Sequence, residues 1–281
     1  MVFERIHAEE FEQIVFCNDS SLGLKAIIAI HSTVLGPATG GCRMWNYISE
    51  SEALEDVLRL SKGMTYKASI SGLEWGGGKA VIWGDPKTQK SPAFLKRYGE
   101  FVDRLGGHYI TAKDVGIGSD DLRIVKSTTK HVLGIDGDKN SSGDPSPATA
   151  WGVYCGIKAT AKHTFKTNSL SGMRIAIQGL GSVAYYLLDY LLGEGANVVA
   201  CDIDSAMVDR AVSKYAIEII RPESIFDVAC DIFAPCALGA AINSDSINRL
   251  RTKAVAGAAN NQLATPQMGY ELMRKGIVYA P

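Results

Sequence analysis

Apolar residues in the second half of the chain alternate between short continuous runs and longer stretches with apolar positions at helical spacing. The longer stretches predict helices at 148–163, 183–194 and 205–214. Six strands joined by helical connections are what a doubly wound parallel sheet, the Rossmann fold, requires. The short runs predict six such strands, at 174–178, 197–202, 217–220, 231–234, 253–257 and 276–280.

The first half of the chain has a less regular pattern. Its apolar runs predict strands at 23–31 and 79–83, and helical spacing predicts a helix at 50–62. A segment rich in Asp, Gly, Ser and Pro at 136–147 indicates a domain boundary. We therefore expect an α/β protein of two domains, an N-terminal α/β domain at 1–140 and a Rossmann domain at 141–281.

Composition and charge exclude several classes of partner. Apolar residues make up 46% and charged residues 21% of the chain, which is typical of a soluble globular protein. The 29 Lys and Arg residues nearly balance the 30 Asp and Glu residues, so the charge gives no reason to expect a nucleic-acid or anionic-membrane partner. No apolar run approaches the ~20 residues of a membrane span, and the acidic N-terminus lacks the apolar region of a secretory signal.

The six cysteines are scattered along the chain, and no two of them form a C-x-x-C pair. The histidines show no metal-ligand spacing to the cysteines or to one another. Scattered cysteines in a chain of this size are typical of buried thiols in a reducing compartment. We therefore expect a cytoplasmic protein without a metal site.

A glycine turn follows the first predicted strand of the second half. Its sequence is GLGSVA at 179–184, and an apolar-faced helix comes directly after it. Gly179 would allow the tight turn, Gly181 would let the backbone approach a pyrophosphate, and Ala184 would let helix and strand pack closely. The helix N-terminus would then direct its amides at the phosphates. The alternative is an ordinary turn between strand and helix. The combination of strand, glycines and helix favours the dinucleotide-binding turn over this alternative.

Asp202 ends the next predicted strand, 23 residues after Gly179. The acid that binds the ribose 2′-hydroxyl of a dinucleotide is expected ~20 residues after the glycine turn. A carboxylate at this position repels a 2′-phosphate, and no arginine lies at 203–206 to bind one. The sequence therefore favours NAD over NADP.

Three polar residues in the first half do not fit a packing role. Lys79 follows three glycines, Lys67 ends a helical run, and Asp114 ends another apolar run. A lysine acts as a general base only if burial or a neighbouring cation lowers its pKa from ~10.4, and otherwise it binds a substrate carboxylate. Asp114 could orient such a base or exchange protons with an amine or imine. The alternative for each is a solvated surface residue, which is the commoner case.

Short motifs rich in glycine and polar residues follow one another along essentially the whole chain. They are GPATGGCRM at 36–44, KGMTYK at 62–67, GGGK at 76–79, TAKDVG at 111–116, SPAT at 146–149, GLGSVA at 179–184, APCALG at 234–239 and GAANNQ at 257–262. In this order they resemble the motifs of the Glu/Leu/Phe/Val dehydrogenase family, and within it they are most similar to those of the leucine dehydrogenases.

The resemblance implies that an L-amino acid is converted to its 2-oxo acid and ammonia, with hydride passed to NAD. It implies that Lys67 binds the substrate carboxylate, that Lys79 is the general base and that Asp114 assists proton transfer. Thr39, Gly40 and Gly41 would line the substrate site. The implied cofactor contacts are Thr149, Gly179, Gly181, Ser182, Val183, Asp202, Ala237, Asn260 and Asn261.

The resemblance leaves the substrate open. An aliphatic amino acid, leucine or valine, is the leading hypothesis, and phenylalanine or tryptophan is the alternative because the catalytic motifs are shared. The chain ends at Pro281, where the family continues with C-terminal helices, so a truncated, non-catalytic NAD-binding form is a third hypothesis. Lys113 replaces the usual glutamate before Asp114, and we expect its charge to perturb that carboxylate. The family also implies a homo-oligomer.

Overall fold

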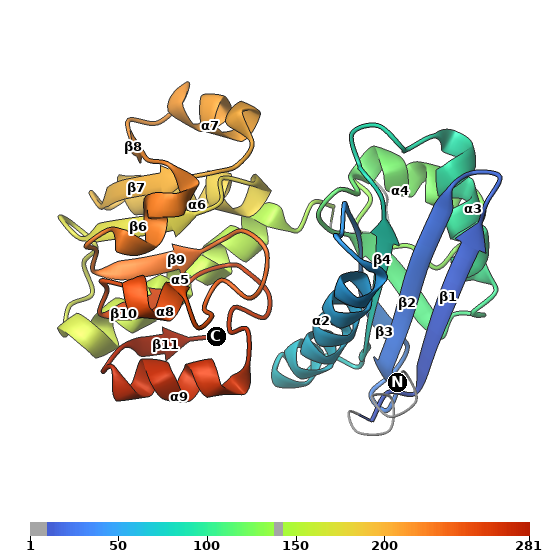
Figure 1. Ribbon diagram of the computed structural model, residues 1–281, viewed down its shortest axis with the longest axis horizontal. Coiled ribbons are helices and arrows are strands. Elements are labelled where there is room, and N and C mark those ends of the chain that lie inside the picture. The colour runs from blue at the N-terminus through green and yellow to red at the C-terminus, as the bar shows by residue number, and fades with distance from the viewer. Residues whose placement is uncertain (1–9, 138–142) are drawn as a thin grey trace. The chain divides into compact units, whose positions relative to one another are not determined.

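The computed structural model describes residues 10–137 and 143–281, which divide into two compact units, Met1–Asp144 and Pro145–Pro281 (Figure 1). Each unit has its own sheet and its own hydrophobic core. The boundary expected at 140/141 and the N-terminal stretch without a signal both lie outside the described residues.

The first unit is built on a mixed five-stranded sheet with the order β1-β2-β4-β3-β5. The strand β2 pairs antiparallel with both β1 and β4, whereas β3 pairs parallel with β4 and β5. The elements along the chain are β1 (Gln13–Asp19), β2 (Leu24–Ser32), β3 (Ala38–Trp45), α2 (Glu50–Ile70), β4 (Gly76–Trp83), α3 (Pro92–Asp103), β5 (Tyr109–Lys113) and α4 (Ser119–Lys126).

Helices cover both faces of this sheet. The helix α2 packs on one face through Ala53, Val57 and Leu58, which contact apolar residues of β2 and β4. The helices α3 and α4 cover the other face and complete the larger core. The α2 N-terminus is capped by Ser49, whose side chain accepts the N–H of Glu52 at 3.2 Å.

The three glycines before Lys79 lie inside β4, so the strand expected at 79–83 begins earlier, at Gly76. A Cβ on Gly77 would lie 1.9 Å from Thr65 Oγ1 of α2, and one on Gly78 would lie 2.8 Å from the Tyr109 ring. The glycines therefore let α2 and β5 approach β4 closely. The helix α2 continues past the expected end at residue 62 to Ile70, and Thr65 in this additional part faces Gly77.

The second unit contains a six-stranded, fully parallel sheet with the order β11-β10-β9-β6-β7-β8. Counted within the unit, this is the order 6-5-4-1-2-3 of a Rossmann fold, and the order reverses between β6 and β9. The predicted doubly wound sheet is thus confirmed. Its elements are α5 (Ser146–Phe165), β6 (Arg174–Gln178), α6 (Ser182–Gly193), β7 (Asn197–Cys201), α7 (Ser205–Val212), β8 (Glu218–Ile219), η1 (Pro222–Asp227), β9 (Ile232–Pro235), α8 (Ser246–Arg249), β10 (Ala254–Ala256), α9 (Pro266–Arg274) and β11 (Val278–Ala280).

Two hydrophobic clusters enclose this sheet. The central strand β6 directs Ile175 and Ile177 into the cluster that contains α5 and α6. Its middle residue, Ala176, belongs to the cluster on the opposite face, with Ile225 of η1 and Leu272 of α9. The alternation of one strand between two covered faces explains why its sequence is a continuous apolar run.

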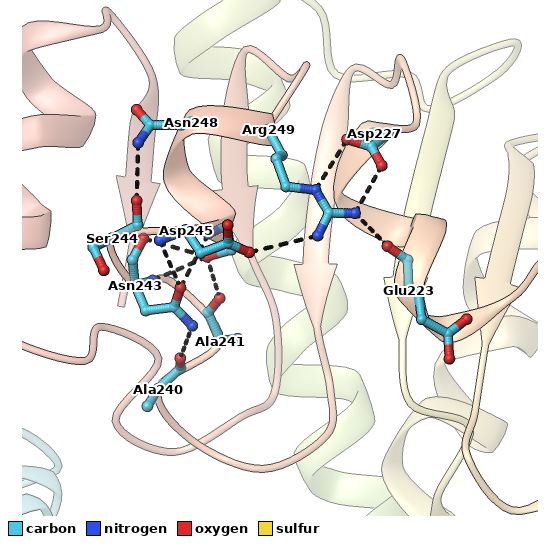
Figure 2. A network of polar contacts seen from close by, with 10 residues as sticks. Glu223, Asp227, Ala240, Ala241, Asn243, Ser244, Asp245, Asn248 and Arg249 are labelled. Atoms are coloured by element: carbon cyan, nitrogen blue, oxygen red, sulfur yellow. Dashed lines mark hydrogen bonds and ion pairs between the residues drawn. The ribbon is translucent and has the colours of Figure 1, made fainter.

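A polar network fixes the segment that follows β9 (Figure 2). Asn243 Oδ1 accepts the N–H groups of Asp245 and Ser246, each at 3.0 Å, and so caps the short helix α8. Arg249 at the end of α8 pairs with Asp227 of η1 through Nε at 3.1 Å and through a terminal nitrogen at 2.7 Å. The network holds the chain segment between β9 and β10 in one conformation.

All six cysteines are free thiols, and Cys17, Cys42 and Cys201 are buried. No helix within residues 10–137 and 143–281 is long and apolar enough to cross a membrane. The same residues contain no group of three His, Cys, Asp or Glu side chains placed to hold a metal ion.

Candidate active site

Lys79 and Asp114, which are 35 positions apart in the sequence, form an ion pair between Nζ and Oδ2. Lys79 lies within β4, and Asp114 directly follows β5. The strand β3 lies between those two strands in the sheet, and its glycines leave room for the pair to meet above it. Only 5% of the Lys79 side chain and 13% of the Asp114 side chain are exposed.

Arg43 of β3 completes this buried group, although it is not among the predicted site residues. Its side chain is 4% exposed, and Nε lies 3.5 Å from Asp114 Oδ2. The Nη1 atom donates to Asp56 Oδ2 of α2 at 2.9 Å, and the Tyr47 hydroxyl donates to the same oxygen at 2.7 Å. An arginine inside an apolar strand is a usable sequence signal, because a buried guanidinium requires an anionic partner.

The electrostatic environment keeps Asp114 ionised. Burial alone would raise its pKa, but the charges of Lys79 and Arg43 outweigh burial and lower the pKa to about 2. The Val115 N–H also donates to Asp114 Oδ1 at 2.7 Å. Lys113, which was expected to perturb this carboxylate, instead pairs with Asp144 at 2.9 Å. The perturbing cations therefore come from β3 and β4.

Lys67 lies in the last turn of α2 and keeps part of its side chain exposed. Partial burial of its ammonium group and the charge of Lys79 lower its pKa, while Asp114 acts in the opposite direction. The two lysines therefore interact electrostatically. A cation at the edge of a buried ion pair is suited to binding a carboxylate.

The Gly40-Gly41 pair of β3 brings the backbone close to this group. A Cβ on Gly40 would lie 1.8 Å from the Gly78 carbonyl oxygen, and one on Gly41 would lie 2.8 Å from Asp114 Cβ. The Tyr109 hydroxyl donates to the Gly40 carbonyl at 2.6 Å. Thr39, which precedes the pair, is half-buried and donates to the Pro37 carbonyl at 3.2 Å.

In the second unit the glycine turn joins β6 to α6. Gly179 is buried with φ +96°, and a Cβ there would lie 2.9 Å from Ala237. At Gly181, the N-cap of α6, a Cβ would meet no atom within 4 Å. The space before the helix N-terminus is therefore open, and Ser182 and Val183 begin the helix whose first amides face it.

Asp202 follows β7 and holds the glycine turn. Its Oδ2 accepts the N–H of Leu180 at 2.6 Å, and its Oδ1 accepts the N–H of Asp204 at 2.8 Å. The sequence did not predict these backbone bonds. A carboxylate has about four acceptor positions, so the bonds leave capacity for a ribose hydroxyl.

The remaining predicted cofactor residues lie after strand ends or at a helix start. Ala237 follows β9 and is exposed, and Asn260 and Asn261 follow β10. The Ala240 N–H donates to the Asn261 carbonyl at 2.8 Å, which ties these two segments together. Thr149 lies in the first turn of α5. The carboxyl edge of an open parallel sheet is where such folds bind ligands.

The family models that match the chain describe its two halves separately. The model "Glu/Leu/Phe/Val dehydrogenase, dimerisation domain" matches residues 11–131, and "Glutamate/Leucine/Phenylalanine/Valine dehydrogenase" matches residues 142–211 and 203–281.

Individual proteins are similar over nearly all of the chain. The leucine dehydrogenase of Thermoactinomyces intermedius is 52% identical over 280 residues, which cover 100% of this chain and 76% of that protein. The phenylalanine dehydrogenase of Bacillus thermotolerans is 46% identical over 285 residues, with 100% of this chain and 74% of that protein covered. The crystal structure of L-tryptophan dehydrogenase from Nostoc punctiforme aligns with TM-score 0.71 and 41% identity, covering 99% of this chain and 80% of that one. The chain therefore belongs to the Glu/Leu/Phe/Val dehydrogenase family.

Proposed function

We propose that the protein catalyses the NAD-dependent oxidative deamination of an aliphatic L-amino acid, leucine or valine, to its 2-oxo acid and ammonia. Membership of the family makes it an amino-acid dehydrogenase, an oxidoreductase that acts on a CH–NH2 group. The single observation that carries the chemistry is the buried Lys79–Asp114 ion pair with Lys67 nearby.

The charge and exposure of each residue in the first unit indicate its role in the reaction. Lys67, partly exposed, binds the substrate carboxylate, beside a substrate site lined by Thr39, Gly40 and Gly41. Lys79 in its neutral form takes a proton from water as the water oxygen attacks the imine carbon. Asp114 remains a carboxylate near neutral pH, because its pKa is about 2, and orients Lys79 through their ion pair. The proton that Lys79 took from water then passes through Asp114 to the departing amine, so Lys79 returns to its neutral form and Asp114 to its carboxylate.

The glycine turn of the second unit fits a dinucleotide. The open space at Gly181 and the free amides of α6 suit a pyrophosphate, and Gly179 permits the tight turn. NAD accepts the hydride from the substrate Cα when it is bound. We assign the cofactor contacts to Thr149, Ser182, Val183, Asp202, Ala237, Asn260 and Asn261 together with these glycines. The Asp202 carboxylate and the absence of arginine at 203–206 support NAD rather than NADP.

The relatives support the choice of substrate. Identity to the leucine dehydrogenase of Thermoactinomyces intermedius, 52%, exceeds that to the phenylalanine dehydrogenase of Bacillus thermotolerans, 46%. An aromatic amino acid is the second candidate, and the similarity to L-tryptophan dehydrogenase also favours it.

A substrate screen tests the proposal. Leucine, valine, phenylalanine, tryptophan and glutamate are each offered with NAD and with NADP, and the reduced cofactor is followed by absorbance. We expect the highest kcat/KM with leucine or valine and NAD. A preference for an aromatic substrate would replace the aliphatic assignment. Retained NAD binding without turnover of any amino acid would favour the non-catalytic form.

We also propose that the protein is a cytoplasmic homo-oligomer assembled through its first unit. The family model that matches residues 11–131 is described as a dimerisation domain, and the six free thiols suit a reducing compartment. Sedimentation equilibrium would give the mass in solution, and a monomer at micromolar concentration would contradict the assembly.

A further inference from the structure

Arg43 is a buried cation whose partners are divided between two carboxylates. Its Nη1 donates to Asp56 at 2.9 Å, whereas Nε has no hydrogen-bond partner among the described residues and lies 3.5 Å from Asp114 Oδ2. That same oxygen is the partner of Lys79. Two cations from neighbouring strands therefore converge on one carboxylate oxygen, one in contact and one just beyond hydrogen-bond distance.

The second cation matters because Lys79 has to give up a proton to act as a base, as the proposed function requires. A neutral Lys79 would leave the buried Asp114 carboxylate without its ionic partner, which is costly in a poorly solvated site. A guanidinium does not lose its proton in proteins, so Arg43 stays charged while Lys79 changes state.

We propose that Arg43 is a positioning residue for the dehydrogenase reaction: it is the permanent counter-ion of Asp114 and thereby favours the neutral form of Lys79. Its Nε–H is the donor that closes on Asp114 Oδ2 when Lys79 releases its proton to solvent. The inference rests on the proposed function, since it assigns Arg43 a role through the base of that reaction.

Asp56 weakens the electrostatic effect of the Arg43 guanidinium on Asp114. It lies on α2, accepts from Arg43 and from Tyr47, and offsets part of the guanidinium charge. The remaining titratable groups near Asp114 keep a fixed state near neutral pH. Burial raises the pKa of Cys42 to about 12 and raises the pKa of Tyr109, so both stay neutral. Lys67 is a further charge that acts on the pair.

The proposal predicts opposite shifts for two variants. R43Q removes the permanent cation, so Asp114 retains the protonated Lys79 more strongly, and the acid limb of the kcat/KM pH profile moves up by about one unit. D56N removes the anion that offsets Arg43, so the limb moves down by about half a unit. R43K keeps the charge, and its limb lies between those of the wild type and R43Q. Loss of packing alone does not produce shifts of opposite sign.

R97Q is the matched control, because Arg97 of α3 in the same unit also bridges two carboxylates, Asp19 and Glu100. We expect its acid limb to coincide with that of the wild type. Circular dichroism and NAD titration establish that each variant is folded. The proposal would be overturned if the acid limbs of the R43Q and D56N pH profiles shifted in the same direction, or if neither limb moved.

A second readout separates this inference from the proposed function. In protein labelled with ¹³C at lysine Cε, the Lys79 resonance is assigned by its loss in K79M and its titration midpoint is followed by NMR. The midpoint is expected to rise in R43Q and to fall in D56N. This holds even if no amino acid is turned over, in which case the proposed reaction fails while the role of Arg43 is still tested. Unchanged midpoints in both variants would overturn the role.

Discussion

Replacing Asp114 by asparagine is expected to destabilise the protein at neutral pH by about 2 kcal/mol. The pKa of this carboxyl falls from an ordinary 3.8 to about 2, because the charges of Lys79 and Arg43 outweigh its burial. One pKa unit corresponds to about 1.4 kcal/mol, which gives the magnitude. The side chain is only 13% exposed, so solvent screens this interaction little.

The sign of the effect fixes its pH window. Since the folded pKa is depressed, the stabilisation is complete above the unfolded pKa near 3.8 and is lost as pH falls through about 2. The assay is urea denaturation of the wild type and D114N at pH 7, 4, 3 and 2. Asp120, paired with Arg123 but 95% exposed at its side chain, provides the control variant D120N. If the difference in free energy of unfolding between wild type and D114N did not shrink below pH 4, the electrostatic account of the Lys79–Asp114 pair would be refuted.

Two further predictions concern the glycines. G77A is expected to lower the free energy of unfolding by about 1–3 kcal/mol, because the new Cβ would lie 1.9 Å from Thr65 Oγ1 of α2; equal urea midpoints for variant and wild type would show that α2 moves aside at little cost. G181V is expected to weaken NAD binding about tenfold or more in a fluorescence titration, while the N-cap change lowers the free energy of unfolding by only about 1 kcal/mol, since a Cβ at Gly181 meets no atom within 4 Å. Wild-type affinity in G181V would mean that the pyrophosphate lies elsewhere.

The Rossmann unit was predictable because its strands are short apolar runs that end at turn-forming residues. The strand β6 has the bounds expected from the sequence, Arg174–Gln178, since a short apolar run ends at the glycine turn. The 3-10 helix η1 and the helix α9 were not expected, because they are short and offer too few turns for a helical spacing to stand out. The hydrophobic pattern therefore predicts secondary structure best where strands and helices alternate regularly.

The first unit was less predictable, because its glycines serve tertiary contacts. The strand was expected to begin at residue 79, yet β4 begins at Gly76, and the glycines at 76–78 lie where α2 and Tyr109 pack closely. Spacing along the chain also gave no indication that Lys79 and Asp114 would meet, since that depends on the strand order β4-β3-β5. Arg43 lies among apolar residues, which is a signal in the sequence, but only the structure identifies its two carboxylate partners.

The central claim is that Lys79 is the base of an NAD-dependent amino-acid dehydrogenase. The most direct measurement compares the wild type with K79A for leucine-dependent reduction of NAD, with NAD binding measured in parallel by fluorescence. We predict that the wild type turns over leucine, and that K79A loses turnover by about a hundredfold to ten-thousandfold but binds NAD as before. Turnover by K79A at a rate close to that of the wild type would contradict the account.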